Sequence, residues 1–111
     1  MTVSDSDLKE IRDICPGATL YSEGGFMYIH LPGLKIPVND KEPLIRDGLL
    51  CLQTHSGYPT RLFLSEQIPG KGKNWSVHRI LDKTWHTWSW NYVPPDDRPA
   101  AVLAQHLRAL R

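Results

Sequence analysis

The stretch that decides the fold runs from Gly57 to Trp90 and reads GYPTRLFLSEQIPGKGKNWSVHRILDKTWHTWSW. It holds all four tryptophans of the chain, three of its eight glycines and two of its five histidines. A Tyr-Pro turn leads into an apolar strand, Arg61 to Ser65, and the composition of Pro69 to Asn74 is typical of a loop. From Val77 to Trp90 the apolar residues recur every three to four positions while the aromatics also suit strands. We expect irregular to helical structure there.

The residues before this stretch predict one helix followed by extended segments. Ser4 to Asp7 offers helix caps and first-turn acids ahead of an apolar face, and Pro16-Gly17 ends that helix. Aromatic and β-branched residues, glycine-containing turns and a continuous apolar run then indicate strands. The expected strand segments are Ala18 to Ser22, Phe26 to Leu31, Leu34 to Val38 and Gly48 to Thr54.

The end of the chain predicts a second helix. Asp96 to Pro99 is a strong helix start, because the acids precede a proline that can occupy the first turn. We expect His106 to face away from the apolar stripe that follows. That stripe consists of Ala100, Leu103, Ala104, Leu107 and Leu110. The element order predicts a single α+β domain over residues 1–111, with both helices packed on one four-stranded antiparallel sheet.

Composition and charge narrow the class of protein. A chain of 111 residues, 41% hydrophobic and 23% charged, is typical of one soluble globular domain. The net charge of +1 favours neither nucleic acid nor anionic lipid as a partner. The polar N-terminus lacks a secretory signal, and no apolar run reaches membrane-spanning length. We therefore expect a cytoplasmic protein in which Cys15 and Cys51 are buried free thiols.

The element order, the Gly57-Tyr58-Pro59 turn before Arg61 to Leu64, and the tryptophans together resemble the E2 ubiquitin-conjugating superfamily. The phrase KTWHTWSW, Lys83 to Trp90, is similar to the bacterial branch called prokaryotic E2 family E, which is found beside ubiquitin-like proteins, E1-like enzymes and JAB-type peptidases. The resemblance covers nearly the whole chain. It implies an E2-like (UBC) fold with a four-stranded meander between two helices. It also implies a ubiquitin-like protein and an E1-like enzyme as partners, and antiphage defence is a hypothesis for the purpose of the pathway.

Two features of the wider E2 family are missing from the sequence. The family has a His-Pro-Asn tripeptide after the strand that follows the Tyr-Pro turn, whereas this chain has Ile68-Pro69-Gly70. The family also carries a catalytic cysteine some residues later, whereas no cysteine follows Cys51 here. Aligned on the family's cysteine segment, Trp75 to Leu81 brings Ser76 to or beside the cysteine position. The resemblance therefore implies a noncanonical E2 that forms an oxyester on Ser76 instead of a thioester.

A serine nucleophile needs a neighbouring base, and His78 and His86 are the candidates. In an extended segment Ser76 and His78 project to the same side. Asn74 could direct its side-chain dipole at an oxyanion, or it could simply form a turn. These four residues are the candidate catalytic set.

Each assignment has a structural alternative. Ser76 could be a loop serine that caps the next segment, which would leave a catalytically inactive adaptor that binds the ubiquitin-like protein or the E1. Another alternative is an unrelated small α+β binding domain. The cluster of Trp85, Trp88 and Trp90 suits a partner-binding face or a core, and we expect at least two of the three to be buried. No zinc-ligand spacing and no P-loop pattern is present, so we expect neither a metal nor a cofactor.

Overall fold

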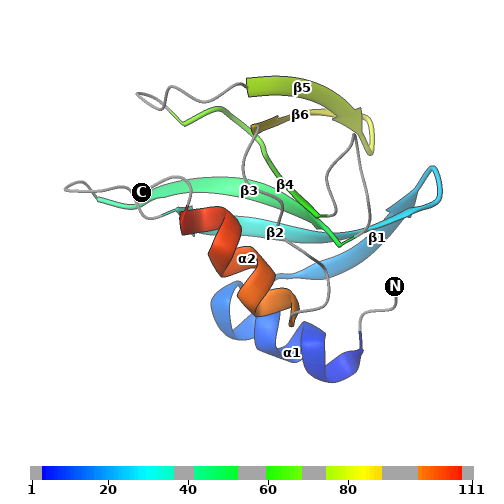
Figure 1. The fold of residues 1–111 in the computed structure, drawn as a ribbon, viewed down its shortest axis with the longest axis vertical. Helices are drawn as coiled ribbons and strands as arrows, with labels where there is room; N and C mark the ends of the chain where they lie inside the picture. The colour runs from blue at the N-terminus through cyan, green and yellow to red at the C-terminus, as the bar shows by residue number, and fades with distance from the viewer. Residues whose placement is uncertain (1–3, 37–41, 53–59, 69–74, 89–97, 109–111) are drawn as a thin grey trace.

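The computed structural model describes residues 4–36, 42–52, 60–68, 75–88 and 98–108, and these form an α+β architecture (Figure 1). In this part of the chain a helix at each end encloses six strands of one antiparallel sheet. The helices are α1 (Asp5–Ile14) and α2 (Pro99–Arg108), and the strands are β1 (Thr19–Glu23), β2 (Phe26–Ile36), β3 (Leu44–Cys51), β4 (Arg61–Leu64), β5 (Trp75–Ile80) and β6 (Lys83–Trp88). The predicted α+β class and the two flanking helices are confirmed.

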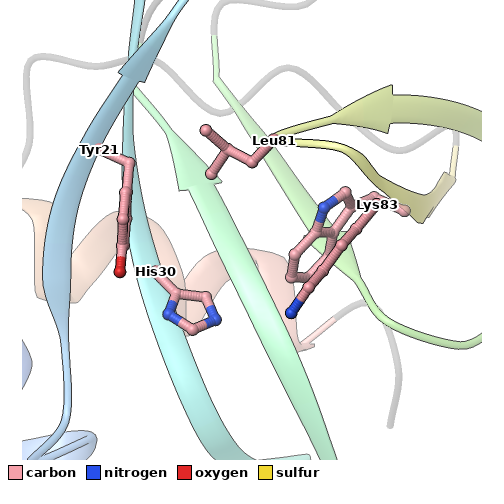
Figure 2. A pocket seen from close by; sticks show the side chains of 5 residues that line it. Tyr21, His30, Leu81 and Lys83 are labelled. Atoms are coloured by element: carbon pink, nitrogen blue, oxygen red, sulfur yellow. The ribbon is translucent and has the colours of Figure 1, made fainter.

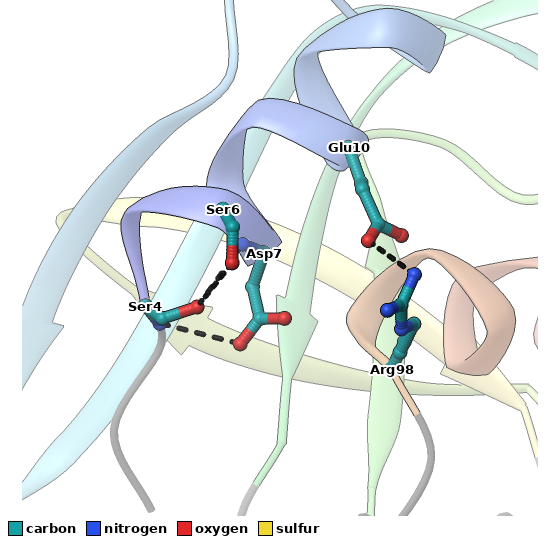
Figure 3. A network of polar contacts seen from close by, with 5 residues as sticks. All are labelled: Ser4, Ser6, Asp7, Glu10 and Arg98. Atoms are coloured by element: carbon teal, nitrogen blue, oxygen red, sulfur yellow. Dashed lines mark hydrogen bonds and ion pairs between the residues drawn. The ribbon is translucent and has the colours of Figure 1, made fainter.

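Helix α1 begins with the predicted cap and forms an exposed ion pair with the residue that precedes α2. Ser4 Oγ accepts a hydrogen bond from the Asp7 amide at 3.1 Å, and the Asp7 carboxylate accepts one from the Ser4 amide at 3.3 Å. This reciprocal pair is a capping box, and it satisfies amides that the first turn leaves without helical partners. Farther along, Arg98 Nη1 lies 2.7 Å from Glu10 Oε1 (Figure 3). The two helices therefore lie side by side on one face of the sheet (Figure 1).

The strands follow the order β1-β2-β3-β4-β6-β5, so the predicted number of four strands is wrong. The first difference from the expected strand segments lies within β2. The segments expected at Phe26 to Leu31 and Leu34 to Val38 form one strand, as far as Ile36, and not two. Its register against β3 shifts between Leu31 and Leu34. Gly33, at φ 65°, permits this bulge because it has no side chain to clash in the left-handed conformation.

The second difference is a β-hairpin where irregular to helical structure was expected. Strands β5 and β6 pair from Trp75 opposite Trp88 to Ile80 opposite Lys83. The intervening residues, Leu81 and Asp82, have φ values of 52° and 60°, as both central residues of a type I′ hairpin turn require. The helix-like spacing combined apolar residues from the two sides of this turn, so it did not describe one helical face.

The sheet has a hydrophobic core on each face. The first core lies against the helices and includes Ile11 of α1, Leu50 of β3 and Leu103 of α2. The second core is formed without a helix by Tyr28, Leu49, Cys51, Phe63, Ile80 and Trp85. Strands β4 and β6 share one register pair, Leu64 opposite His86, in the described residues. The β5–β6 hairpin therefore departs from the plane of the sheet and covers the face opposite the helices (Figure 1).

Helix α2 buries a face that overlaps the predicted stripe, because Leu103 is in the first core and Ala100 and Leu107 pack against it, but the buried face also includes Val102 and His106. Pro99 is its first residue, as expected for a proline in the first turn. Val102, Leu103 and His106 are buried, whereas Ala104 of the predicted stripe is exposed. His106 enters the core because its Nε2 lies 2.9 Å from Thr60 Oγ1, which satisfies a polar atom that would otherwise oppose burial. Neither helix in the described ranges is long and apolar enough to cross a membrane.

Candidate functional site

Ser76 and His78 lie two positions apart on β5 and project from the same face of that strand. Ser76 Oγ and His78 Nε2 are 3.5 Å apart, the outer limit of a hydrogen bond. Both side chains are half-buried, whereas Val77 between them is exposed on the other face. The strand conformation thus brings together the hydroxyl and the imidazole that the sequence had suggested as a pair.

The surroundings of His78 favour its neutral form. Burial lowers the pKa of His78, and the positive charge of Arg61 lowers it further. The imidazole also packs edge to face against Phe63 of β4, with ring centroids 5.5 Å apart. A neutral imidazole at neutral pH is the form that can accept a proton from a neighbouring hydroxyl.

Arg61 is the member of this site that the sequence analysis missed. It is only 6% exposed, although it carries a charge, and it lies at the start of β4. Its Nε donates a hydrogen bond to Thr87 Oγ1 at 3.2 Å, and that hydroxyl donates to the Leu62 carbonyl at 2.8 Å. Thr87 is the cross-strand partner of Ser76. A guanidinium is therefore held on the face of the sheet that carries the Ser76 hydroxyl, and it could interact with an anionic group there.

A signal for Arg61 was present in the sequence. Arginine is almost never fully buried unless it is paired, and here it opens the short apolar strand Arg61–Leu64, in which every residue is buried. Strand alternation then puts it on the same face as Phe63. The face of the sheet that residues 75–88 cover could not be predicted, because this segment was not recognised as a hairpin.

His86 is not placed to act on Ser76. It is the partner of Val77 in the β5–β6 register, whereas Ser76 is opposite Thr87. Because successive side chains of a strand point to opposite faces, His86 lies on the face away from Ser76 and His78. Its Nδ1 is buried and has no hydrogen-bond partner among the residues described. The fourth predicted residue, Asn74, lies outside the described residues.

The tryptophans divide between the two cores. Trp85, 3% exposed, is opposite His78 and donates a hydrogen bond from its indole nitrogen to the Ile80 carbonyl at 3.1 Å. Trp88 is equally buried and belongs to the first core, which lies against the helices. Its ring packs against that of Trp75, with ring centroids 5.4 Å apart. The prediction that at least two of the three clustered tryptophans are buried is confirmed. Trp90 lies outside the described residues.

A cavity of about 210 Å³ lies beside His78, between β5 and the turn that joins β1 to β2. Phe26 and Tyr28 contribute aromatic walls, and Arg79 contributes a cationic side chain. At the adjoining β5–β6 turn the Leu81 amide donates a short hydrogen bond to the Glu23 carboxylate. The imidazole is therefore accessible from a partly apolar space large enough for a short acyl group.

Neither cysteine is placed to act as a nucleophile. Cys15 and Cys51 are both buried thiols that form no disulfide among the described residues, as predicted. The Cys15 thiol donates to the Pro32 carbonyl at 3.0 Å, and burial raises its pKa. Both effects keep the protonated form, which is the unreactive one. Among the described residues no group of three or more side chains could hold a metal ion.

Comparison of the chain with protein-family models, with curated proteins and with solved structures found no match.

Proposed function

We propose that the protein is a noncanonical E2-like acyl carrier that accepts a ubiquitin-like protein from an E1-like enzyme as an oxyester on Ser76. The contact between Ser76 Oγ and His78 Nε2 at 3.5 Å is the observation that carries this proposal. A hydroxyl beside a neutral imidazole is the arrangement by which a serine becomes a nucleophile. The resemblance of the sequence to prokaryotic E2 family E supplies the class of substrate.

The reaction is an acyl transfer between two side chains. Ser76 Oγ attacks the carbonyl carbon of the thioester that joins the C-terminus of the ubiquitin-like protein to the E1-like enzyme. His78 Nε2 takes the hydroxyl proton, the carbon–sulfur bond breaks, and the departing thiolate receives that proton. The products are an oxyester on Ser76 and a free thiol on the E1-like enzyme.

Arg61 and Thr87 support this step from the neighbouring strands. The carbonyl oxygen gains negative charge during attack, and a buried guanidinium on the same face stabilises that charge more strongly than water does. Burial, and secondarily the charge of this guanidinium, lowers the pKa of the His78 ring and keeps it neutral before the reaction. Arg61 therefore acts at two points, on the base and on the developing oxyanion.

The chemistry can be tested without the partners by using p-nitrophenyl acetate as an acyl donor. We expect acetylation of Ser76, detected by peptide mass spectrometry, with loss of p-nitrophenolate. Replacing His78 with Gln should slow the acetylation of Ser76 about 100-fold, which is a common contribution of a general base. Ser22→Ala, which removes an exposed serine of β1, is the matched control and should react as the wild type does. Equal acetylation of the wild type and Ser76→Ala would contradict the proposed nucleophile.

One observation favours a second function, that of an inactive adaptor. Val77 is 57% exposed on β5, on the face opposite Ser76, and β5 is an edge strand in the described sheet. An exposed apolar residue on an edge strand is suited to binding another chain. An adaptor would bind the ubiquitin-like protein through this surface, and Val77→Asp would abolish the complex while Ser76→Ala would leave it intact.

A further inference from the structure

A second cavity, of about 170 Å³, lies beside β6 and the β5–β6 turn. Its lining comes from three strands and one turn that are distant in sequence. The lining residues are Tyr21, His30, Leu81, Lys83 and Trp85. None of them belongs to the proposed acyl-transfer pair, so the cavity is not explained by that chemistry.

The cavity has an aromatic wall. The Tyr21 and His30 rings meet edge to face at 5.7 Å, and the His30 and Trp85 rings do so at 6.2 Å. The indole nitrogen of Trp85 already donates to the Ile80 carbonyl, so this ring presents mainly apolar surface to the cavity. A flat apolar body would pack against these rings.

The polar groups of the cavity gather at one end. Figure 2 shows the Tyr21 hydroxyl, the His30 ring and the Lys83 ammonium toward one end, whereas the Leu81 side chain lies toward the other. A hydroxyl and an ammonium are hydrogen-bond donors, and an imidazole always carries at least one donor nitrogen. In the described part of the chain Lys83 forms no ion pair. The Glu23 carboxylate is bonded to the Leu81 amide, at the apolar end.

From this arrangement we infer that the cavity between β1, β2 and β6 binds a small organic carboxylate attached to a flat apolar body. The carboxylate accepts hydrogen bonds from Tyr21 and Lys83 and lies next to His30, and charge-assisted bonds of this kind are stronger than neutral ones. The apolar body packs against Trp85 and Leu81. Cations of the same shape are excluded by the Lys83 ammonium. This site goes beyond the proposed acyl transfer and does not depend on it.

The test uses 3-phenylpropionate as the probe and 3-phenylpropylamine as its cationic counterpart. Both are titrated into the full chain while the indole NH signals are followed by NMR. We expect the acid to shift the Trp85 signal, assigned by its absence in Trp85→Phe, and the amine to bind at least about tenfold more weakly. Lys83→Gln should weaken binding of the acid about threefold to tenfold, and Tyr21→Phe should weaken it as well.

Lys35→Gln is the matched control, because Lys35 is exposed on β2 and does not line the cavity. It should bind the acid as tightly as the wild type does. Thermal melting of each variant verifies that it is folded. Substitutions at the exposed Lys83 and Tyr21 should leave the melting temperature unchanged. The inference is overturned if the amine binds as well as the acid, if Lys83→Gln binds as the wild type does, or if neither probe shifts the Trp85 signal.

Discussion

Glu23 at the end of β1 and Leu81 in the β5–β6 turn are 58 positions apart in sequence, yet the Glu23 carboxylate accepts a hydrogen bond from the Leu81 amide. This contact joins the tips of two hairpins and holds the β5–β6 hairpin over the second core. Leu81 adopts a positive φ that is unfavourable for a residue with a side chain. A bond to its amide stabilises the turn that requires this conformation.

Removal of the Glu23 carboxylate should loosen this turn. We expect Glu23→Ala to lower the free energy of unfolding by about 1 kcal/mol, because the bond involves a charged acceptor but is exposed to water. Urea denaturation measures the loss, and hydrogen exchange should show faster exchange of the Leu81 amide. Glu42→Ala removes an exposed carboxylate near β3 and should have little effect on either quantity. Equal Leu81 exchange in both variants would contradict the stabilising role of the contact.

Trp85 should contribute strongly to stability. Its side chain is buried in the second core, and its indole nitrogen is hydrogen-bonded to Ile80. We expect Trp85→Ala to cost about 3 to 5 kcal/mol, the usual range for removal of a buried large aromatic side chain. Thermal or urea unfolding provides the measurement. If the melting temperature did not change, the indole would belong to an interface with another molecule and not to the core.

His106 should make stability depend on pH in the acidic range. Burial, and secondarily the charge of Arg61, lower its pKa to about 4 in the folded protein, below the ordinary value of 6.5. Between these values the unfolded chain binds more protons than the folded protein, so stability increases with pH there. The contribution is complete above pH 6.5 and is lost as the pH falls toward 4. The linkage corresponds to about 3 kcal/mol.

The variant His106→Gln tests this dependence. Its free energy of unfolding should vary less between pH 4 and 6.5 than that of the wild type, because the titrating group is gone. The variant also loses the native bond to Thr60, so the comparison uses the slope against pH and not the absolute stability. Identical slopes for the two proteins would show that other groups control the acid response.

The sequence predicted the local features of the fold well. The cap at Ser4, the proline at the start of α2 and the apolar run at Leu49 to Leu52 depend on residues that are neighbours in the chain. The β5–β6 hairpin was missed because its turn is Leu81-Asp82, whereas Asn-Gly or Asp-Gly is the usual signal for positive φ. Without this turn, the segment showed only ambiguous spacing.

The candidate site was predictable in part for the same reason. Ser76 and His78 could be paired from strand periodicity alone, since two positions in an extended segment share a face. The rejection of His86 and the addition of Arg61 required the register of β5, β6 and β4, which depends on long-range pairing. The burial of His106 likewise depended on Thr60, which is 46 positions away in the sequence.

The central claim is that Ser76 accepts the C-terminus of a ubiquitin-like protein. The most direct measurement is an intact-mass spectrum after incubation with ATP, an E1-like enzyme and a ubiquitin-like protein, for the wild type and for Ser76→Ala. We predict an adduct of the partner's mass that resists thiol reductants, is cleaved by mild base and is absent in Ser76→Ala. A stable complex by gel filtration without any covalent adduct would contradict the acyl-carrier account and favour the adaptor.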